Sequence, residues 1–437
     1  MIKTFQDHID SKLPFLKNSA LLLAISGGID SVVLTHLCYK TGLNIALAHC
    51  NFNLRGKESD ADEDFVLQLA DDLELEAFVE SFDTEAFAED EKLSIQMAAR
   101  TLRYHWFSEL TAQLKFDYIL TAHHADDNLE TFFINLSRGT GLDGLLGIPE
   151  VNNNIVRPLL PYSREDIENY AKEYKLKWRE DSSNSSTKYL RNKLRHDVIP
   201  ILKEINPHLL QNFAKTQTFL NDSKFIIEDR ISDITNKVIK LIEGHTVTLN
   251  IEEIKNLSHP KAYLYELLKN YGFTEWHDVF NLLEAQSGKQ IKTNTHRLIK
   301  DRDCLLLSEI HKEEDGQTIP VSETDKIVET PFGMLVFDEV DAVLETSKTA
   351  VYVDKDLLKF PLTVRKWEKG DVFYPLGMTG KKKLSKYFKD EKFSLLDKEN
   401  TWLLCSNDVI VWVINKRADN RFRITDTTKH ILKVELK

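Results

Sequence analysis

Short apolar runs alternate with longer amphipathic stretches over the first 200 residues of the chain. The runs are typical of buried strands, and the stretches between them place apolar residues at helical spacing. The strand-like runs are ALLLAI (20–25), NIALAHCNF (44–52), AFVESF (77–82) and DYILTA (117–122). This order predicts an α/β fold, a parallel twisted sheet flanked by helices on both faces.

The helical stretches of this region have recognisable apolar faces and ends. The predicted helices cover residues 31–42, 58–73, 94–114 and 128–137. Gly42 can end the first of them in the left-handed conformation. A GxGxxG pattern, Gly139–Gly144, follows a helical run instead of a strand. It therefore predicts a turn that ends a helix, not a dinucleotide site.

The pattern changes after residue 200. Residues 201–287 look helical, and 212–242 form one long amphipathic pattern. From about residue 318 the chain is rich in strand-like runs interrupted by Gly and Pro. We predict three domains: an α/β domain over 1–205, a helical domain over 206–315 and a small mixed α+β domain over 316–437.

Charge is distributed unevenly along the 437 residues, whose net charge is −12. Residues 58–91 hold 15 Asp and Glu and no Lys or Arg. Residues 361–393 hold nine Lys and Arg against four Asp and Glu, interleaved with aromatic residues. Such a surface suits a polyanion with stackable bases, although a solvated lysine-rich hairpin has the same composition.

Four cysteines lie far apart, at positions 38, 50, 304 and 405, without a CxxC pair. This spacing predicts no disulfide framework and no thiolate zinc site, and is typical of a reducing cytoplasm. We expect no membrane contact, because no stretch of 18 apolar residues occurs and the N-terminus has no signal-peptide core.

The stretch SGGIDS follows the first strand-like run and opens the first helix. Two glycines let the backbone approach a phosphate closely, and the amides and dipole of the new helix favour an anion. Asp30 fits beside phosphates if Mg²⁺ lies between them. The alternative is an ordinary helix start with Ser26 or Asp30 as its cap. The predicted phosphate loop comprises Ser26, Gly27, Gly28, Ile29, Asp30 and Ser31.

Other polar segments follow the second and fourth strands. Ligands of open parallel sheets bind at the carboxyl ends of the strands, so these segments should converge on the loop. The polar residues they supply are His49, Asn51, Arg55, His123, Asp126 and Asp127. Arg100 and Arg103 share a helix face, and one of them could balance charge on a leaving pyrophosphate; both could also be surface arginines. Asp127 could instead cap a helix, with Glu130 at its third position.

The loop resembles the pyrophosphatase loop of the N-type ATP pyrophosphatases, the PP-loop superfamily. Within it, the chain is similar to the tRNA(Ile)-lysidine synthases over most of residues 20–200 and 361–393. The matching segments are AHCNFNLRGKES (48–59), AARTLRY (98–104), TAHHADDNLETFFINLSRGTGLDGLLGIP (121–149), RPLLPYSR (157–164), EDSSN (180–184), RNKLRHDVIP (191–200) and GDVFYPLGMTGKKKLSKYF (370–388). Phe52 departs from the pattern, since the family often has a histidine there.

The resemblance implies ATP, Mg²⁺, L-lysine and a tRNA(Ile) with a CAU anticodon as cofactors and substrates. AMP would be transferred to oxygen 2 of the wobble cytidine, and the lysine amine would then displace it. Residues 26–31 would cradle the β- and γ-phosphates, with Asp30 aiding Mg²⁺. His123 and Arg103 would stabilise the α-phosphate and pyrophosphate, and Asp127 would orient the metal or the amine. The expected tRNA contacts are Arg191, Lys193 and Arg195 near the site, and Lys381, Lys382, Lys383 and Lys386 farther out.

Other functions use the same kind of loop. A tRNA thiolase usually needs paired cysteines, and glutamine-driven amidation needs a glutaminase nucleophile; neither is recognisable here. A non-catalytic nucleotide sensor that binds RNA predicts ATP binding without pyrophosphate release. The sequence leaves a homodimer open.

Overall fold

The computed structural model describes residues 1–180, 190–310, 318–343, 347, 349–378 and 380–437. It divides into two compact units, residues 1–227 and 228–437, and helix α11 (Leu209–Val238) crosses the division. Within these described ranges, no helix is both long and apolar enough to span a membrane.

The first unit is built on a six-stranded sheet in the order β3-β2-β1-β4-β6-β5. All neighbouring strands are parallel except β5 and β6, which form an antiparallel hairpin at one edge. The strands are β1 (Leu21–Ala24), β2 (Ile45–Asn51), β3 (Ala77–Ser81), β4 (Tyr118–Leu120), β5 (Val151–Asn152) and β6 (Ile155–Val156). The predicted parallel α/β sheet is confirmed; its last two strands were too short to be seen in the sequence.

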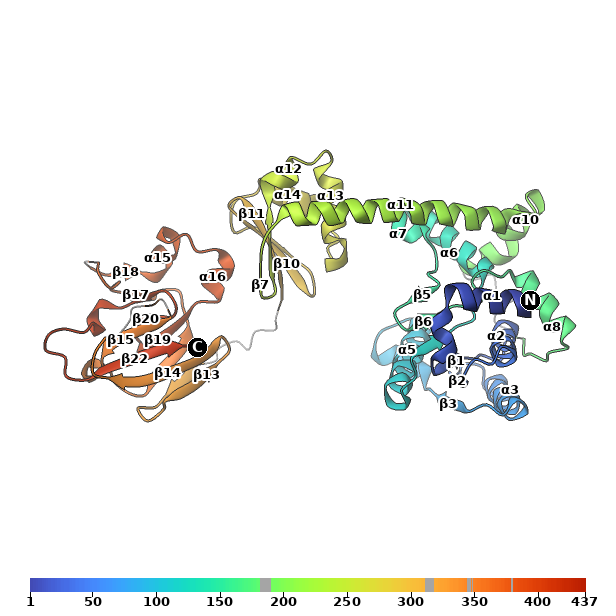
Figure 1. Cartoon of the computed structure of the whole chain (residues 1–437), viewed down its shortest axis with the longest axis horizontal. Helices are drawn as coiled ribbons and strands as arrows, with labels where there is room; N and C mark the ends of the chain where they lie inside the picture. The colour runs from blue at the N-terminus through green and yellow to red at the C-terminus, as the bar shows by residue number, and fades with distance from the viewer. Residues whose placement is uncertain (181–189, 311–317, 344–346, 348, 379) are drawn as a thin grey trace. The chain divides into compact units, whose positions relative to one another are not determined.

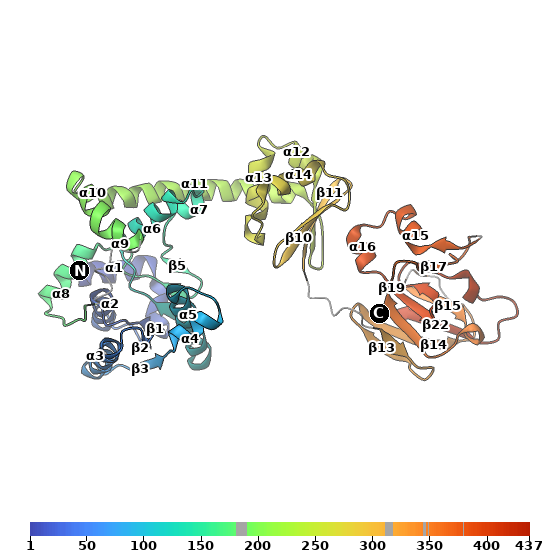
Figure 2. The same ribbon diagram turned by 180° about the vertical axis from the view of Figure 1, so that it is seen from behind.

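Helices cover both faces of this sheet, as successive residues of β1 show. Leu21 and Leu23 belong to the core that the sheet shares with α1, α2 and α8. Leu22 points the other way and packs with Trp106 and Phe107 of α5. Figure 1 shows α1 and α2 on one side of the strands and α5 on the other, and Figure 2 shows them from behind. The helices are α1 (Ile2–Lys12), α2 (Ile29–Lys40), α3 (Lys57–Leu73), α4 (Thr84–Asp90), α5 (Ile95–Leu114), α6 (Ala125–Ser137), α7 (Leu142–Leu145), α8 (Arg164–Glu173), α9 (Leu190–Lys193) and α10 (Ile199–Ile205).

Glycines end two of these helices as the sequence predicts. Gly42 follows α2 with a φ of +70°, and Gly139 follows α6 with a φ of +72°. Both lie in the left-handed region that favours glycine. The GxGxxG pattern is therefore a helix-ending turn that leads into α7.

The second unit consists mainly of antiparallel sheets, ordered β7-β8-β11-β10-β9, β12-β16-β19-β20-β21, β13-β14-β22-β15 and β17-β18. Its strands are β7 (Ile239–Glu243), β8 (Thr246–Asn250), β9 (Gln290–Lys292), β10 (His296–Asp301), β11 (Cys304–Glu309), β12 (Ile319–Val321), β13 (Ile327–Thr330), β14 (Gly333–Val340), β15 (Ala350–Asp354), β16 (Leu362–Lys366), β17 (Val372–Phe373), β18 (Lys382–Lys383), β19 (Trp402–Ser406), β20 (Val409–Val413), β21 (Arg417–Ala418) and β22 (Ile431–Leu436). Its helices are α12 (Ile251–Lys255), α13 (Pro260–Leu268), α14 (Trp276–Asn281), α15 (Leu384–Asp390) and α16 (Leu395–Glu399).

The expectation that residues 201–287 are helical is wrong for residues 239–250. Helix α11 stops at Val238, and residues 239–250 form the β7–β8 hairpin around Gly244. β-branched residues on both sides of this glycine favour strands, and they outweigh the helical spacing that the preceding residues establish.

All four cysteines are free thiols. Burial raises the pKa of Cys50 to about 12 and that of Cys405 to about 11, and it also raises the pKa of Cys38. These three thiols therefore stay protonated at neutral pH.

Candidate active site

The SGGIDS segment forms a tight loop between β1 and α2. Gly27 has a φ of +81°, and Gly28 is the N-cap of α2 without a side-chain cap. The Ser31 hydroxyl donates to the Gly28 carbonyl at 2.9 Å and accepts from the Ser26 amide at 3.2 Å. Neither Ser26 nor Asp30 caps the helix, so the first amides of α2 are open to an anion, as a phosphate loop requires.

Asp30, in the first turn of α2, is paired with an arginine. Arg164, at the start of α8, donates from Nη1 to both carboxylate oxygens, at 2.8 and 2.7 Å. The Arg164 backbone amide donates to Asp126 at 2.8 Å. Burial raises the pKa of Asp30, while His124 and Arg164 partly oppose this shift. The loop carboxylate thus has a resident cation beside it.

The HHADD segment brings two histidines and two carboxylates from the end of β4 to this loop. The buried His124 has Nε2 3.7 Å from Asp30 and 3.4 Å from Asp127. Asp127 also accepts from the His124 amide at 3.1 Å, so it caps α6 as well as facing the loop. His123 Nδ1 lies 3.0 Å from the Thr121 hydroxyl, and burial lowers the pKa of His123 to about 4. His123 is therefore neutral at physiological pH.

Two of the three cations expected to contact RNA near the site are engaged by carboxylates. Glu130 of α6, only 1% exposed, accepts from Arg191 Nε at 2.8 Å and Arg195 Nε at 2.6 Å. Arg195 also donates to Asp127 at 2.9 Å. Lys193 lies on the same segment and is exposed.

A second group of cations lies on the other side of the carboxyl edge. The Arg103 guanidinium lies 5.1 Å from the centre of the Phe52 ring, and that of Arg100 lies 4.8 Å from the Tyr104 ring. Arg157, which follows β6, is 6% exposed and donates to the Pro149 carbonyl at 2.7 Å. Phe52 thus supports Arg103 by stacking.

The segment after β2 packs against the loop through a chain of contacts. His49 Nδ1 lies 2.9 Å from the Ile25 carbonyl oxygen. Asp62 of α3 binds Arg55 at 2.8 Å and Arg179 at 2.9 Å, and the Arg179 amide donates to the Gly27 carbonyl at 2.9 Å. Asn51 instead donates to Glu63 at 2.8 Å. The structure therefore ties His49 and Arg55 to the phosphate loop, whereas Asn51 faces Glu63 of α3.

The remaining predicted tRNA contacts belong to the second unit. Lys381, Lys383 and Lys386 are exposed, whereas Lys382 pairs with Asp390 at 2.9 Å and lies over the Tyr387 ring. Of the EDSSN motif, residues 181–184 lie outside the described part of the chain.

Sequence reasoning assigned no role to Arg157, Arg164 or Glu130, although all three lie at the site. Arg157 and Arg164 are the first and last residues of RPLLPYSR, whose resemblance to the family gives neither of them a role. In the sequence, Glu130 has only the spacing of a partner in a helix cap. The role of each depends on the side chains that it contacts, and these partners are distant in the sequence.

The geometry defines an α/β nucleotide-binding domain of the PP-loop class, and the family model described as a PP-loop domain matches residues 1–202. Two further models match residues 242–310 and 362–435, described as the TilS substrate binding domain and the TilS substrate C-terminal domain.

Three curated relatives, all named tRNA(Ile)-lysidine synthase, align along nearly the whole chain. The Parabacteroides distasonis protein is 42% identical, covering 99% of each chain. The Bacteroides thetaiotaomicron protein is 40% identical, covering 97% of each, and the Caldanaerobacter subterraneus protein is 30% identical, covering 96% of this chain and 94% of the relative. The chain belongs to the tRNA(Ile)-lysidine synthase family.

Proposed function

We propose that the chain ligates lysine to carbon 2 of the wobble cytidine in the CAU anticodon of tRNA(Ile), forming lysidine. ATP is consumed through an adenylated tRNA intermediate, and AMP and pyrophosphate are released. Family membership supports the reaction. The observation that carries it structurally is the convergence of His124 and Asp127 on Asp30 of the phosphate loop, with Nε2 of His124 between the two carboxylates.

The proposed chemistry needs no enzyme nucleophile. Oxygen 2 of cytosine is a poor leaving group, and transfer of AMP to it makes a good one. The lysine side-chain amine can then attack carbon 2 and expel AMP. Positioning of the reactants and neutralisation of phosphate charge supply the rate enhancement in such transfers.

Each group at the carboxyl edge has a proposed part. The amides after Gly28 and the hydroxyls of Ser26 and Ser31 bind the β- and γ-phosphates. Arg103 balances charge on the α-phosphate and the departing pyrophosphate. Neutral His123 offers a hydrogen bond there without adding charge. Asp127 orients the incoming amine, to which a carboxylate is the natural partner.

The carboxylates at the site fit a magnesium ion that is held jointly by protein and by the phosphates of ATP. The described residues contain no group of three or more His, Cys, Asp and Glu able to hold a metal. Mg²⁺ commonly binds one or two carboxylates together with substrate phosphates, and Asp30 is the carboxylate nearest the phosphate loop. Bound there, the ion would neutralise phosphate charge.

We assign tRNA binding to the two later domains, residues 206–315 and 316–437, and to the RNKLR segment near the site. Exposed Lys381, Lys383 and Lys386 and the neighbouring aromatic residues supply the basic surface. Lys193 supplies a further cation near the site. The carboxylate pairs of Arg191 and Arg195 reduce the charge that those two residues can offer to phosphates.

The test combines the purified chain with ATP, labelled L-lysine and an unmodified tRNA(Ile) transcript with a CAU anticodon. Label should enter the RNA with stoichiometric release of pyrophosphate and AMP. Asp30→Ala should lower the rate by roughly 100-fold or more. Asp10→Ala is the control. It removes an exposed carboxylate on α1 that pairs with Lys17, and it should leave the rate unchanged.

Two outcomes would contradict the proposal. Nucleotide binding without pyrophosphate release would indicate a sensor, and pyrophosphate release without lysine incorporation would indicate another PP-loop reaction such as thiolation. Equal modification of tRNA(Met), which shares the anticodon, would contradict the role of the later domains in selecting the tRNA.

A further inference from the structure

The arginines around the carboxyl edge of the sheet fall into two groups. Arg164, Arg179, Arg191 and Arg195 each form an ion pair with Asp30, Asp62 or Glu130. Arg100, Arg103 and Arg157 have no carboxylate within ion-pair distance in the part of the chain that the structure describes. Positive charge near the active site is therefore neutralised where carboxylates of α2, α3 and α6 face it. The arginines of α5 and the one after β6 have no such counter-charge among the described residues.

Arg157 is the most unusual of these three. Its side chain is buried, and the hydrogen-bond partner that the structure gives it is neutral, the Pro149 carbonyl oxygen. Its Nε atom has no hydrogen-bond partner among the described residues. A buried cation without a counter-charge is costly, so such a group is usually retained where an anionic ligand completes it.

Arg100 and Tyr104 of α5 are both neighbours of this buried cation. The exposed Arg100 guanidinium lies 4.8 Å from the centre of the Tyr104 ring, and both side chains are near enough to Arg157 to act on its charge. Stacking on an aromatic face fixes a guanidinium without using its N–H groups. Arg100 is thus held in place, and no described residue accepts a hydrogen bond from its guanidinium, so its donors can bind phosphate oxygens.

The position of this cluster separates it from the phosphate loop. Arg157 follows β6, and β4 lies between β6 and β1, the strand that carries the loop. Adjacent strands are about 4.8 Å apart, which places the end of β6 roughly 10 Å from the end of β1 along the sheet edge. His123, at the end of β4, lies between them.

We infer that Arg100, Tyr104 and Arg157 form a subsite for a backbone phosphodiester of the RNA, next to the nucleotide that is modified. This inference rests on the proposed function. A phosphate of ATP would have the same chemistry, but the β- and γ-phosphates have their own cradle at the end of β1. The buried Arg157 supplies a fixed positive potential, and the exposed Arg100 supplies the N–H donors that contact the phosphate.

Arg100→Ala is the main test, because the side chain is exposed and its removal leaves the core intact. Affinity for the tRNA(Ile) transcript and for ATP is measured separately, at several salt concentrations. We expect RNA affinity to fall roughly 3- to 10-fold near physiological salt, and the slope of log K against log salt to decrease by about 0.7 to 0.9. ATP affinity should not change. Arg100→Lys, which keeps the charge, should recover part of the RNA affinity.

Lys115→Ala is the matched control, since Lys115 is an exposed cation at the opposite end of the same helix. It should bind RNA like the unmodified chain. Arg157→Met, with its fold checked by circular dichroism, should weaken RNA binding in the same direction as Arg100→Ala. If that variant does not fold, Arg100→Ala and Arg100→Lys still decide the question.

Two results would overturn the inference. The first is that Arg100→Ala and Lys115→Ala have the same RNA affinity and the same slope of log K against log salt. The other is a loss of ATP affinity in place of RNA affinity, which would assign the cluster to the nucleotide phosphates. If the unmodified chain incorporates lysine while either result holds, the subsite alone is wrong and the proposed function stands.

Discussion

The negative charge of Asp30, a carboxylate within a phosphate loop, is offset by neighbouring side chains. Beside bound phosphates a bare carboxylate would be repulsive, and in the structure Arg164 and His124 face it. Arg164 is 40% exposed and is also bound to Glu168, so it has an alternative partner within reach. Arg164 can therefore neutralise the Asp30 carboxylate and can also turn to Glu168, so it does not block access of phosphates to the loop permanently.

His123 makes stability depend on pH in a defined direction. Its folded pKa of about 4 lies below the ordinary value of 6.5, so between these values the unfolded chain binds more protons. Its contribution to stability is therefore full above about pH 6.5 and is lost as the pH falls towards 4. The loss can reach about 3 kcal/mol. Urea unfolding at pH 4.5 and 7.5 should show this loss, and His123→Gln should reduce it.

The control for this prediction is His105→Gln, because His105 is exposed on α5. It should keep the full pH dependence of the unmodified chain. An unchanged pH dependence in His123→Gln would show that His123 is accessible to protons in the folded state.

At the scale of elements, the turn between β1 and α2 depends on one glycine. Gly27 has a φ of +81°, and a Cβ there would lie 3.4 Å from Phe65 and 3.6 Å from Arg179. Gly27→Ala should lower the free energy of unfolding by about 1 to 2 kcal/mol. It should also weaken ATP binding, because the first amides of α2 move with the loop. Calorimetric titration with ATP and denaturant unfolding measure the two effects.

Gly42→Ala provides the comparison. Gly42 also has a positive φ of +70°, but a Cβ there would meet nothing within 4 Å. It should lose similar stability and keep its ATP affinity. Equal ATP affinity in both variants would contradict the role of the SGG turn in binding phosphate.

The elements that sequence could predict are those whose pattern is local. The apolar run of β1 and the helical spacing of α5 repeat over enough residues to reveal their burial. The β5–β6 hairpin and the β7–β8 hairpin are short, and their pairing is decided by neighbours distant in sequence. At the site, the loop, His123 and Asp127 could be found because topology brings strand ends together. The pairing of Arg191 and Arg195 with Glu130 could not, because nothing in their spacing identifies a partner.

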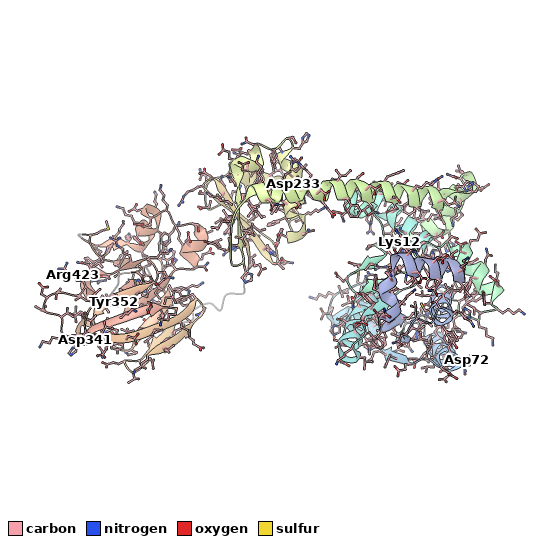
Figure 3. All side chains as sticks on the ribbon, in the orientation of Figure 1. Lys12, Asp72, Asp233, Asp341, Tyr352 and Arg423 are labelled. Carbon is pink, nitrogen blue, oxygen red and sulfur yellow. The ribbon has the colours of Figure 1, made fainter. Side chains whose placement is uncertain are left out.

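At the scale of the whole molecule, charge of opposite sign is gathered on different units. Residues 58–91 of the first unit hold 15 carboxylates, and Asp72 on α3 is one of the exposed ones (Figure 3). The nine cations of residues 361–393 belong to the second unit. A polyanion is attracted to the latter and repelled by the former.

The lysines of this basic segment should therefore carry much of the salt dependence of RNA binding. Replacing Lys381, Lys383 and Lys386 together by Ala should lower the slope of log K against log salt by about 2 to 3, at roughly 0.7 to 0.9 per contact. Replacing the exposed Lys326, Lys359 and Lys429 of the same unit should change it little. Equal slopes for the two triple variants would show that the segment is only a solvated surface.

The protonated state of Cys38, Cys50 and Cys405 makes the chain well suited to fluorescent labelling. A thiol that stays protonated reacts slowly with maleimides, so these three should take up little dye at neutral pH. With Cys304 changed to serine, a cysteine introduced at Lys383 would be the fastest-reacting group. A dye attached there could report docking of the RNA in real time, in a chain that keeps its three protonated cysteines.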